Sequence, residues 1–109
     1  MKPRAVGFLH REISGARQEA DEHAIRVTAG TAHLDLARTF ACSHLVEQPM
    51  QRLENILSRV ESNTIIVPEL RHLDDAAKLN ERYRIVVAAH DLGGKPKIWE
   101  PHTLMAVAR

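Results

Sequence analysis

The chain has 109 residues, with fifteen Lys or Arg against fourteen Asp or Glu, and a formal net charge of +1. This length is typical of one domain, so residues 1–109 are expected to fold as a single unit. A dedicated nucleic-acid binder normally carries much more positive charge. The single cysteine excludes an internal disulfide, and no apolar run is long enough to span a membrane. We therefore expect a cytoplasmic protein without a membrane segment.

Short apolar runs predict the strands of a sheet. Thr64–Val67 contains almost no polar residue, which is typical of a strand buried on both faces. A short edge strand is expected at Lys97–Trp99, after the break at Gly93–Gly94. The remaining predicted strands are Arg4–Leu9, His33–Phe40 and Arg84–Ala89.

Helices are predicted between these strands. Apolar residues at offsets of three, six, seven and ten make Met50–Val60 the clearest amphipathic helix, with Pro49 in its first turn. A helix over about Ala16–Ala29 is expected to begin after a Ser14 cap and to stop at Gly30. Leu70–Tyr83 is predicted as a third, short helix. The expected core-facing residues of the first helix are Ala20, Ala24, Val27 and Ile25.

Strands that alternate with helices imply an α/β fold with right-handed crossovers. We expect a three-layer α/β/α domain with a mostly parallel sheet of four to five strands. Its core covers about residues 4–91, and residues 92–109 form a tail that is either an edge strand or a dimer contact. Ligands of such folds bind beyond the carboxyl ends of the strands. The loops at residues 10–14, 41–48, 68–75 and 90–96 are therefore the candidate site.

Patterns for bound cofactors and metals are weak in this sequence. The first strand–helix turn, HREISG, has only one glycine, and GGKPK lacks the Ser or Thr that follows the lysine of a phosphate loop. Cys42 with His44, and His72 with Asp74 and Asp75, are two isolated groups, whereas zinc needs three or four converging ligands. We therefore expect neither a cofactor nor a metal.

Several motifs resemble the catalytic domain of serine recombinases, the resolvase and invertase family. RAVGFL is followed by Arg11 and Ser14, with Gln18 and Asp21 further on. TAHLDLARTF, the helix over Met50–Val60 and NTIIVPELRHLDD continue the same layout, so that the resemblance covers about residues 4–91. It implies a resolvase-like fold in which a serine attacks a DNA phosphodiester among several arginines.

The first-strand motif of the family reads roughly G-Y-x-R-V-S, and this chain fits it in two registers. Without a gap, His10 takes the place of the arginine and Glu12 that of the serine. With an insertion, Arg11 and Ser14 take those places, and the agreement at Gln18 and Asp21 favours this second register. Both assignments stay open from sequence alone.

The second motif departs more strongly from the family's L-D-R-L-x-R-D. When Leu70 and Leu73 are aligned with its leucines, Arg71 stands where the family has Asp and His72 where it has Arg. Asp75 then replaces the second arginine beside an anionic substrate, which is electrostatically unfavourable. No catalytic set is intact, and Arg11, Ser14, Arg71 and His72 are vestigial candidates.

The resulting hypothesis is a resolvase-like domain that has lost site-specific recombinase activity. It would act as a binding, regulatory or self-association module, as a homo-oligomer or with a protein partner. DNA binding by this chain alone is expected to be weak. The alternative is a divergent DNA-processing phosphotransfer enzyme or nuclease that uses a rebuilt site around Ser14.

Overall fold

The structure is a computed structural model that describes residues 2–89 and 95–104. Its five-stranded sheet has the order β2-β1-β3-β4-β5. The first four strands in this order are parallel, and β5 pairs antiparallel with β4. Residues 90–94 of the candidate loop at 90–96, with the break expected at Gly93–Gly94, and residues 105–109 of the expected tail lie outside the described residues.

Eleven elements make up the described chain. The strands are β1 (Arg4–His10), β2 (Asp35–Cys42), β3 (Thr64–Val67), β4 (Arg84–Val87) and β5 (Lys97–Trp99). The helices are α1 (Arg11–Ser14), α2 (Gln18–Thr31), α3 (Pro49–Arg59) and α4 (Ala76–Asn80), with the 3-10 turns η1 (Gly15–Arg17) and η2 (Leu70–His72). No helix in the described ranges is long and apolar enough to cross a membrane.

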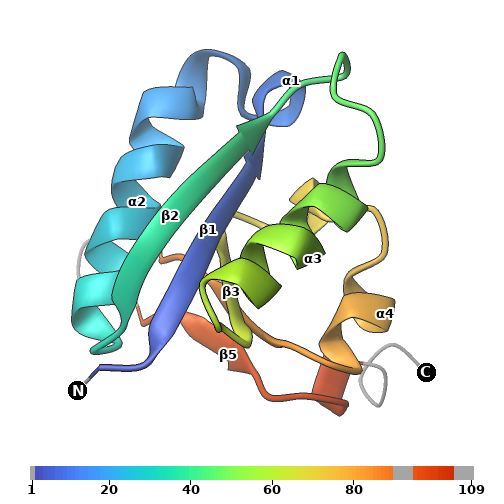
Figure 1. Ribbon diagram of the computed structural model, residues 1–109. Coiled ribbons are helices and arrows are strands. Elements are labelled where there is room, and N and C mark those ends of the chain that lie inside the picture. The colour runs from blue at the N-terminus through green and yellow to red at the C-terminus, as the bar shows by residue number, and fades with distance from the viewer. Residues whose placement is uncertain (1, 90–94, 105–109) are drawn as a thin grey trace.

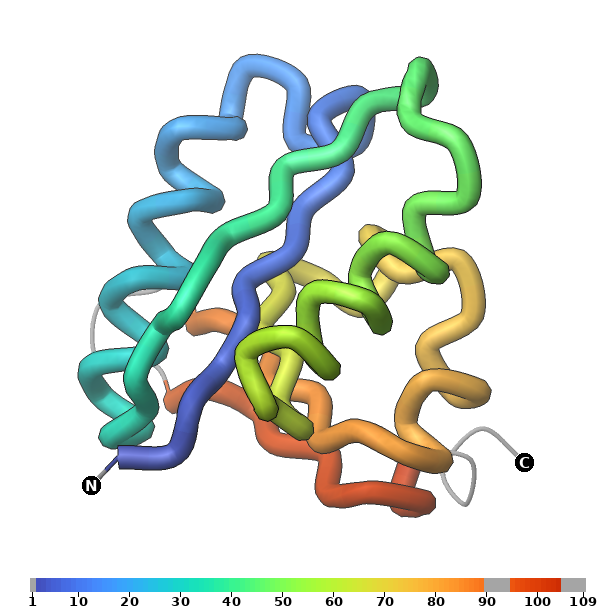
Figure 2. The backbone as a smooth tube through the Cα atoms, viewed as in Figure 1, coloured from blue at the N-terminus to red at the C-terminus, as the bar shows by residue number. Residues whose placement is uncertain are grey.

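Helices cover both faces of the sheet, as Figure 1 shows, and the alternating side chains of the strands divide the core into two clusters. Val6 and Phe8 of β1 belong to the cluster that holds α3 and α4, whereas Ala5 and Leu9 belong to the cluster that holds α2. Figure 2 traces β1 through the sheet between β2 and β3. The expected three-layer α/β/α fold with a mostly parallel sheet is confirmed, and it is compatible with a resolvase-like fold.

The predicted face of α2 was wrong at Ala20 and Val27, while Ala24 is partly buried. Ala20 is exposed and Val27 is 52% exposed, whereas Ile25 is fully buried as expected. The other buried positions of the helix are Asp21, Thr28 and Ala29. Two polar residues thus share the buried face, and this mixture hides the helical period from a hydrophobicity pattern.

The boundaries of α2 and β2 also differ from the prediction. α2 runs through Gly30 to Thr31, and the chain turns at His33, whose φ of 57° is left-handed. β2 therefore starts two residues later than expected, at Asp35, and ends at Cys42. Residues 11–14, expected to be a loop, form the helical turn α1.

The single helix predicted over Leu70–Tyr83 is instead the turn η2 followed by the short helix α4. Leu73 is extended (φ −95°, ψ 136°), which interrupts the helix after His72. Asp75 is not helical either (φ −144°, ψ 83°), and its Oδ1 accepts a hydrogen bond of 3.1 Å from the Lys78 N–H. This N-cap starts α4 at Ala76, because a capping aspartate satisfies a free amide of the first turn.

β5 is the short edge strand that was expected at Lys97–Trp99. Alternation along this strand leaves Ile98 46% exposed and buries Trp99 in the core of the α3 and α4 face. Leu104 belongs to the same core cluster. Trp99 and Leu104, which belong to the tail that was expected to form an edge strand or a dimer contact, are therefore part of the chain's own core.

Candidate functional site

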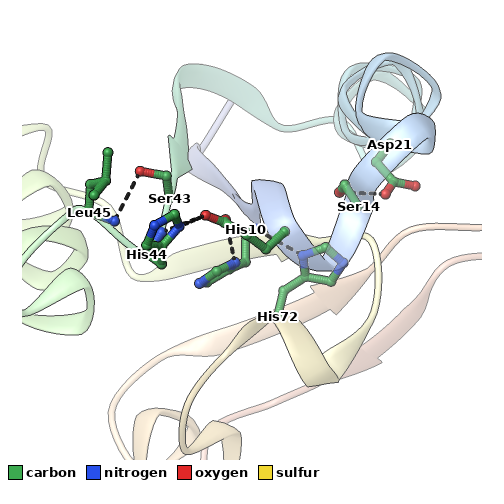
Figure 3. Close-up of polar contacts among 8 residues, drawn as sticks. His10, Ser14, Asp21, Ser43, His44, Leu45 and His72 are labelled. Carbon is green, nitrogen blue, oxygen red and sulfur yellow. Dashed lines mark hydrogen bonds and ion pairs between the residues drawn. The ribbon is translucent and has the colours of Figure 1, made fainter.

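The carboxyl ends of the three strands β1, β2 and β3 bring the candidate residues to one edge of the sheet (Figure 3). β1 ends at His10 and is followed by α1, which carries Glu12 and Ser14. β2 ends at Cys42, two residues before His44. η2 follows β3 and carries Arg71 and His72.

Ser14 is buried and hydrogen-bonded to a carboxylate. Its side chain is 5% exposed, and its Oγ donates a hydrogen bond of 2.7 Å to Oδ2 of Asp21, which is 3% exposed. Arg17 lies on the outer side of this pair, with Nη2 3.8 Å from Oδ1 of Asp21. Ser14 thereby links α1 to α2.

The predicted N-cap role of Ser14 was wrong. Ser14 is in the right-handed helical conformation (φ −65°, ψ −43°), and its side chain makes no capping hydrogen bond. An N-cap residue is normally extended, because only then does its side chain reach the free amides of the first turn. Here η1 separates Ser14 from the start of α2 at Gln18.

His72 is the other internal member of the candidate set. It is 1% exposed, and its Nδ1 accepts a hydrogen bond of 2.9 Å from the main-chain N–H of His10. Burial lowers the pKa of His72 from its usual 6.5, an effect that Arg71 and His10 reinforce and that the charges of Asp21 and Glu69 oppose. Because Nδ1 is an acceptor, the neutral ring carries its proton on Nε2.

Glu12 connects the chain after β2 to α1. Its Oε1 accepts a hydrogen bond of 2.8 Å from the His44 N–H and also contacts the His44 ring, while Oε2 lies 3.2 Å from Nδ1 of His10. The hydrogen bond from the His44 N–H is the main reason that the pKa of Glu12 falls to about 2. Glu12 is thus an ionised carboxylate that links α1 to the segment after β2.

The two arginines of the candidate set do not join Ser14. Arg11 and Arg71 are both exposed. Arg71 pairs locally, with Nε 3.2 Å from Oε2 of Glu69. Of the four sequence candidates, Ser14 and His72 are buried at this edge of the sheet. Ser14 donates a hydrogen bond to Asp21, and the charge of Asp21 opposes the lowering of the His72 pKa. The arginines remain at the surface.

Sequence reasoning missed the role of Asp21 as the buried partner of Ser14. Asp21 counted only as a matching position of the family layout, because an aspartate in a helix is normally solvated. The spacing from Ser14 to Asp21 is seven residues, two turns of an uninterrupted helix. Such a spacing indicates contact only when the chain is helical throughout, and residues 10–14 were expected to be a loop.

The His, Cys, Asp and Glu side chains in the described part of this edge do not converge as metal ligands would. Within residues 2–89 and 95–104, no group of three or more His, Cys, Asp or Glu side chains could hold a metal ion. Cys42 is buried, and this burial raises the pKa of its thiol. A raised pKa disfavours the nucleophilic thiolate.

No protein-family model, curated protein or solved structure matches this chain.

The burial of His72 predicts a loss of stability in mild acid. Unfolding lets His72 take up a proton near its usual pKa of 6.5, whereas the folded chain binds that proton only at lower pH. The unfolded state then holds more protons, so the free energy of unfolding falls as the pH drops below 6.5. His72→Asn, whose Oδ1 can accept the His10 N–H, is expected to flatten this dependence in urea titrations between about pH 7 and 5.

The matched control is His23→Asn, because His23 is an exposed residue of α2. It should leave the pH dependence of wild type intact. Glu12 does not interfere, since its lowered pKa makes its contribution disappear only as the pH falls from 4.5 through about 2. Equal slopes for wild type and His72→Asn would contradict the assignment of a neutral, buried His72.

Proposed function

We propose that this chain is a resolvase-like domain that has lost site-specific recombinase activity and acts as a binding and self-association module. The observation that carries the proposal is the position of Ser14. Its hydroxyl is buried and donates its proton to Asp21 over 2.7 Å. A serine that attacks a phosphodiester must present this oxygen to the phosphorus atom.

The charges at the candidate edge support the loss of phosphodiester chemistry. The transition state of phosphoryl transfer is stabilised by positive groups that converge on the phosphate. Arg71 is paired with Glu69, and the exposed residues Asp74 and Asp75 follow in the same segment. Together with ionised Glu12, these carboxylates make the edge unfavourable for a DNA backbone.

The proposal is tested by trapping a covalent intermediate. Wild-type chain, Ser14→Ala and Ser58→Ala are incubated with fluorescent duplex or single-stranded DNA, and covalent adducts are sought on a denaturing gel. We expect no adduct with any variant. Ser58 is the control because it is an exposed serine of α3. An adduct that forms with wild type and Ser58→Ala but not with Ser14→Ala would instead establish the enzyme built around Ser14.

The self-association part of the proposal concerns β5, which has no second neighbouring strand within the described residues. Ile98 is a large apolar residue left 46% exposed on this edge strand. Open strand edges offer unpaired backbone groups to a second chain. Ile98→Glu is expected to shift the chain to monomer in sedimentation equilibrium. Val27→Glu, at the 52% exposed position on α2, should not. A wild-type chain that is strictly monomeric at high concentration would overturn this part.

A further inference from the structure

A groove between the edge strand β2 and helix α3 has the size of a ligand site. It has a volume of about 540 Å³, which falls within the range of small-molecule pockets. Arg38 and Phe40 of β2 line one wall, and Gln51, Arg52 and Arg59 of α3 line the other. Neither Ser14 nor His72, nor any of their hydrogen-bond partners, is among the residues that line the groove.

A β-bulge in β2 turns two of these side chains into the groove. Ala5 of β1 pairs with Leu36, but the next residue, Val6, pairs with Arg38, so that Ala37 is the extra residue. Leu36 packs in the cluster on the α2 face, whereas Arg38 and Phe40 stand opposite Val6 and Phe8 of the α3 face. Without the bulge, regular alternation would place Arg38 on the α2 face.

Positive charge is concentrated in the groove. Its lining contains three arginines and one acidic residue, Glu47, a local balance of +2 (three minus one) in a chain whose total is +1. The side chain of Arg52 is held by a hydrogen bond of 3.1 Å, which its Nε donates to the main-chain oxygen of Glu47. The side chains of Arg38 and Arg59 make no hydrogen bond or ion pair with any residue in the ranges 2–89 and 95–104. Two guanidinium groups are therefore available to an anion.

The spacing of the arginines suits an extended ligand. Arg52 and Arg59 are seven residues apart on α3, so they lie on one side of the helix and about 10 Å apart along its axis. Arg38 faces them from β2. Guanidinium groups bind phosphate oxygens through paired N–H donors.

The groove also holds an aromatic ring in a fixed orientation. Phe40 is partly buried and packs edge-to-face against the fully buried Phe8, with ring centroids 5.6 Å apart. An anchored ring with an accessible part is a platform on which a nucleobase can stack. Gln51 and Asn55 lie beside it and are joined by a hydrogen bond of 3.0 Å. Side-chain amides of this kind hydrogen-bond to base edges.

We propose that this groove binds a nucleoside phosphate, with the base stacked on Phe40 and the phosphate held by Arg38 and Arg59. The ligand is either a free nucleotide or part of a single-stranded nucleic acid, since both present the same base and phosphate. This site goes beyond the proposed function and does not depend on it, because it involves neither Ser14 nor β5. Ser14→Ala should bind as wild type does.

Fluorescence anisotropy over a salt series tests the groove with two probes, a labelled short single-stranded oligonucleotide and a labelled adenine nucleotide. Arg38→Gln/Arg59→Gln is expected to lower affinity at least about tenfold, and to reduce the oligonucleotide's salt slope by about 0.7, the change expected for the one phosphate that the two arginines hold. Phe40→Leu should lower affinity at least about fivefold through lost stacking, without changing that slope. Each variant must retain the urea unfolding curve of a folded chain.

The matched control is Arg26→Gln, because Arg26 is an exposed arginine of α2, on the opposite face of the sheet. It should leave affinity and slope unchanged. Binding of the oligonucleotide alone would identify a nucleic-acid strand as the ligand, and binding of both probes would identify the nucleoside phosphate unit itself. The proposal is overturned if wild type binds neither probe at low salt, if the double variant binds as wild type, or if inorganic phosphate competes as well as the nucleotide.

Discussion

Replacing Asn80 with alanine is expected to lower the free energy of unfolding by about 3–4 kcal/mol. Asn80 is fully buried, and its Nδ2 donates to the main-chain oxygens of Tyr83 and Trp99, each at 3.0 Å. Its Oδ1 accepts a hydrogen bond of 2.8 Å from the Leu104 N–H. The substitution leaves three backbone groups without this partner, and each unsatisfied buried group costs about 1–3 kcal/mol.

The same change should loosen β5, since Asn80 is the side chain that links α4 to this strand and to the turn after it. The only tryptophan, Trp99, reports directly on this event. Urea unfolding followed by circular dichroism and by Trp99 fluorescence gives both readings. Asn80→Asp keeps the volume and removes the donors, so it should destabilise as strongly. Asn55→Ala, at an exposed position on α3, should change stability by less than about 0.5 kcal/mol. A loss below 1 kcal/mol for both Asn80 variants would contradict the linking role.

Gly7→Ala is expected to destabilise the fold by about 1–3 kcal/mol through overpacking between β1 and α2. A Cβ at Gly7 would lie 2.7 Å from Cγ2 of Ile25 and 3.0 Å from Oγ1 of Thr39. Ile25 is fully buried, and its β-branched side chain has few alternative rotamers. Either α2 moves away from the sheet or the contact remains strained.

Gly30→Ala is the matched control and should act in the opposite direction. Gly30 lies in α2 with open space around the position of a Cβ. Alanine there is expected to stabilise the protein by about 0.5–1 kcal/mol, because glycine loses more backbone entropy in a helix. Urea unfolding of the two variants beside wild type measures both effects. Wild-type stability for Gly7→Ala would show that α2 can shift outward at no net cost.

Most of the layer architecture could be predicted from local patterns. The run Thr64–Val67 is fully buried as β3, at the bounds expected from its apolar composition. The amphipathic helix predicted over Met50–Val60 is α3, shifted by one residue. Both elements combine an unbroken apolar pattern with nearby chain-breaking residues, so local preference and tertiary packing agree.

The candidate site was less accessible to sequence reasoning, because its contacts join distant residues. His72 was predicted in the candidate loop at residues 68–75, with no partner assigned to it, yet it is buried against His10, 62 positions earlier in the chain. Ser14 and Asp21 come together only because residues 11–17 are helical, in α1 and η1. Polar residues in a core are paired by tertiary contacts, and a hydrophobicity pattern does not contain that pairing.

The sequence by itself determined the α/β class, the number of layers and the edge at which the strands present their loops. Those features follow from apolar runs and their spacing, which act over a few residues. Only the tertiary structure decided that Ser14 is turned inward and that the bulge at Ala37 directs Arg38 and Phe40 toward α3. A single extra residue reverses the facing of every later side chain in a strand, and that residue is defined by pairing with the neighbouring strand.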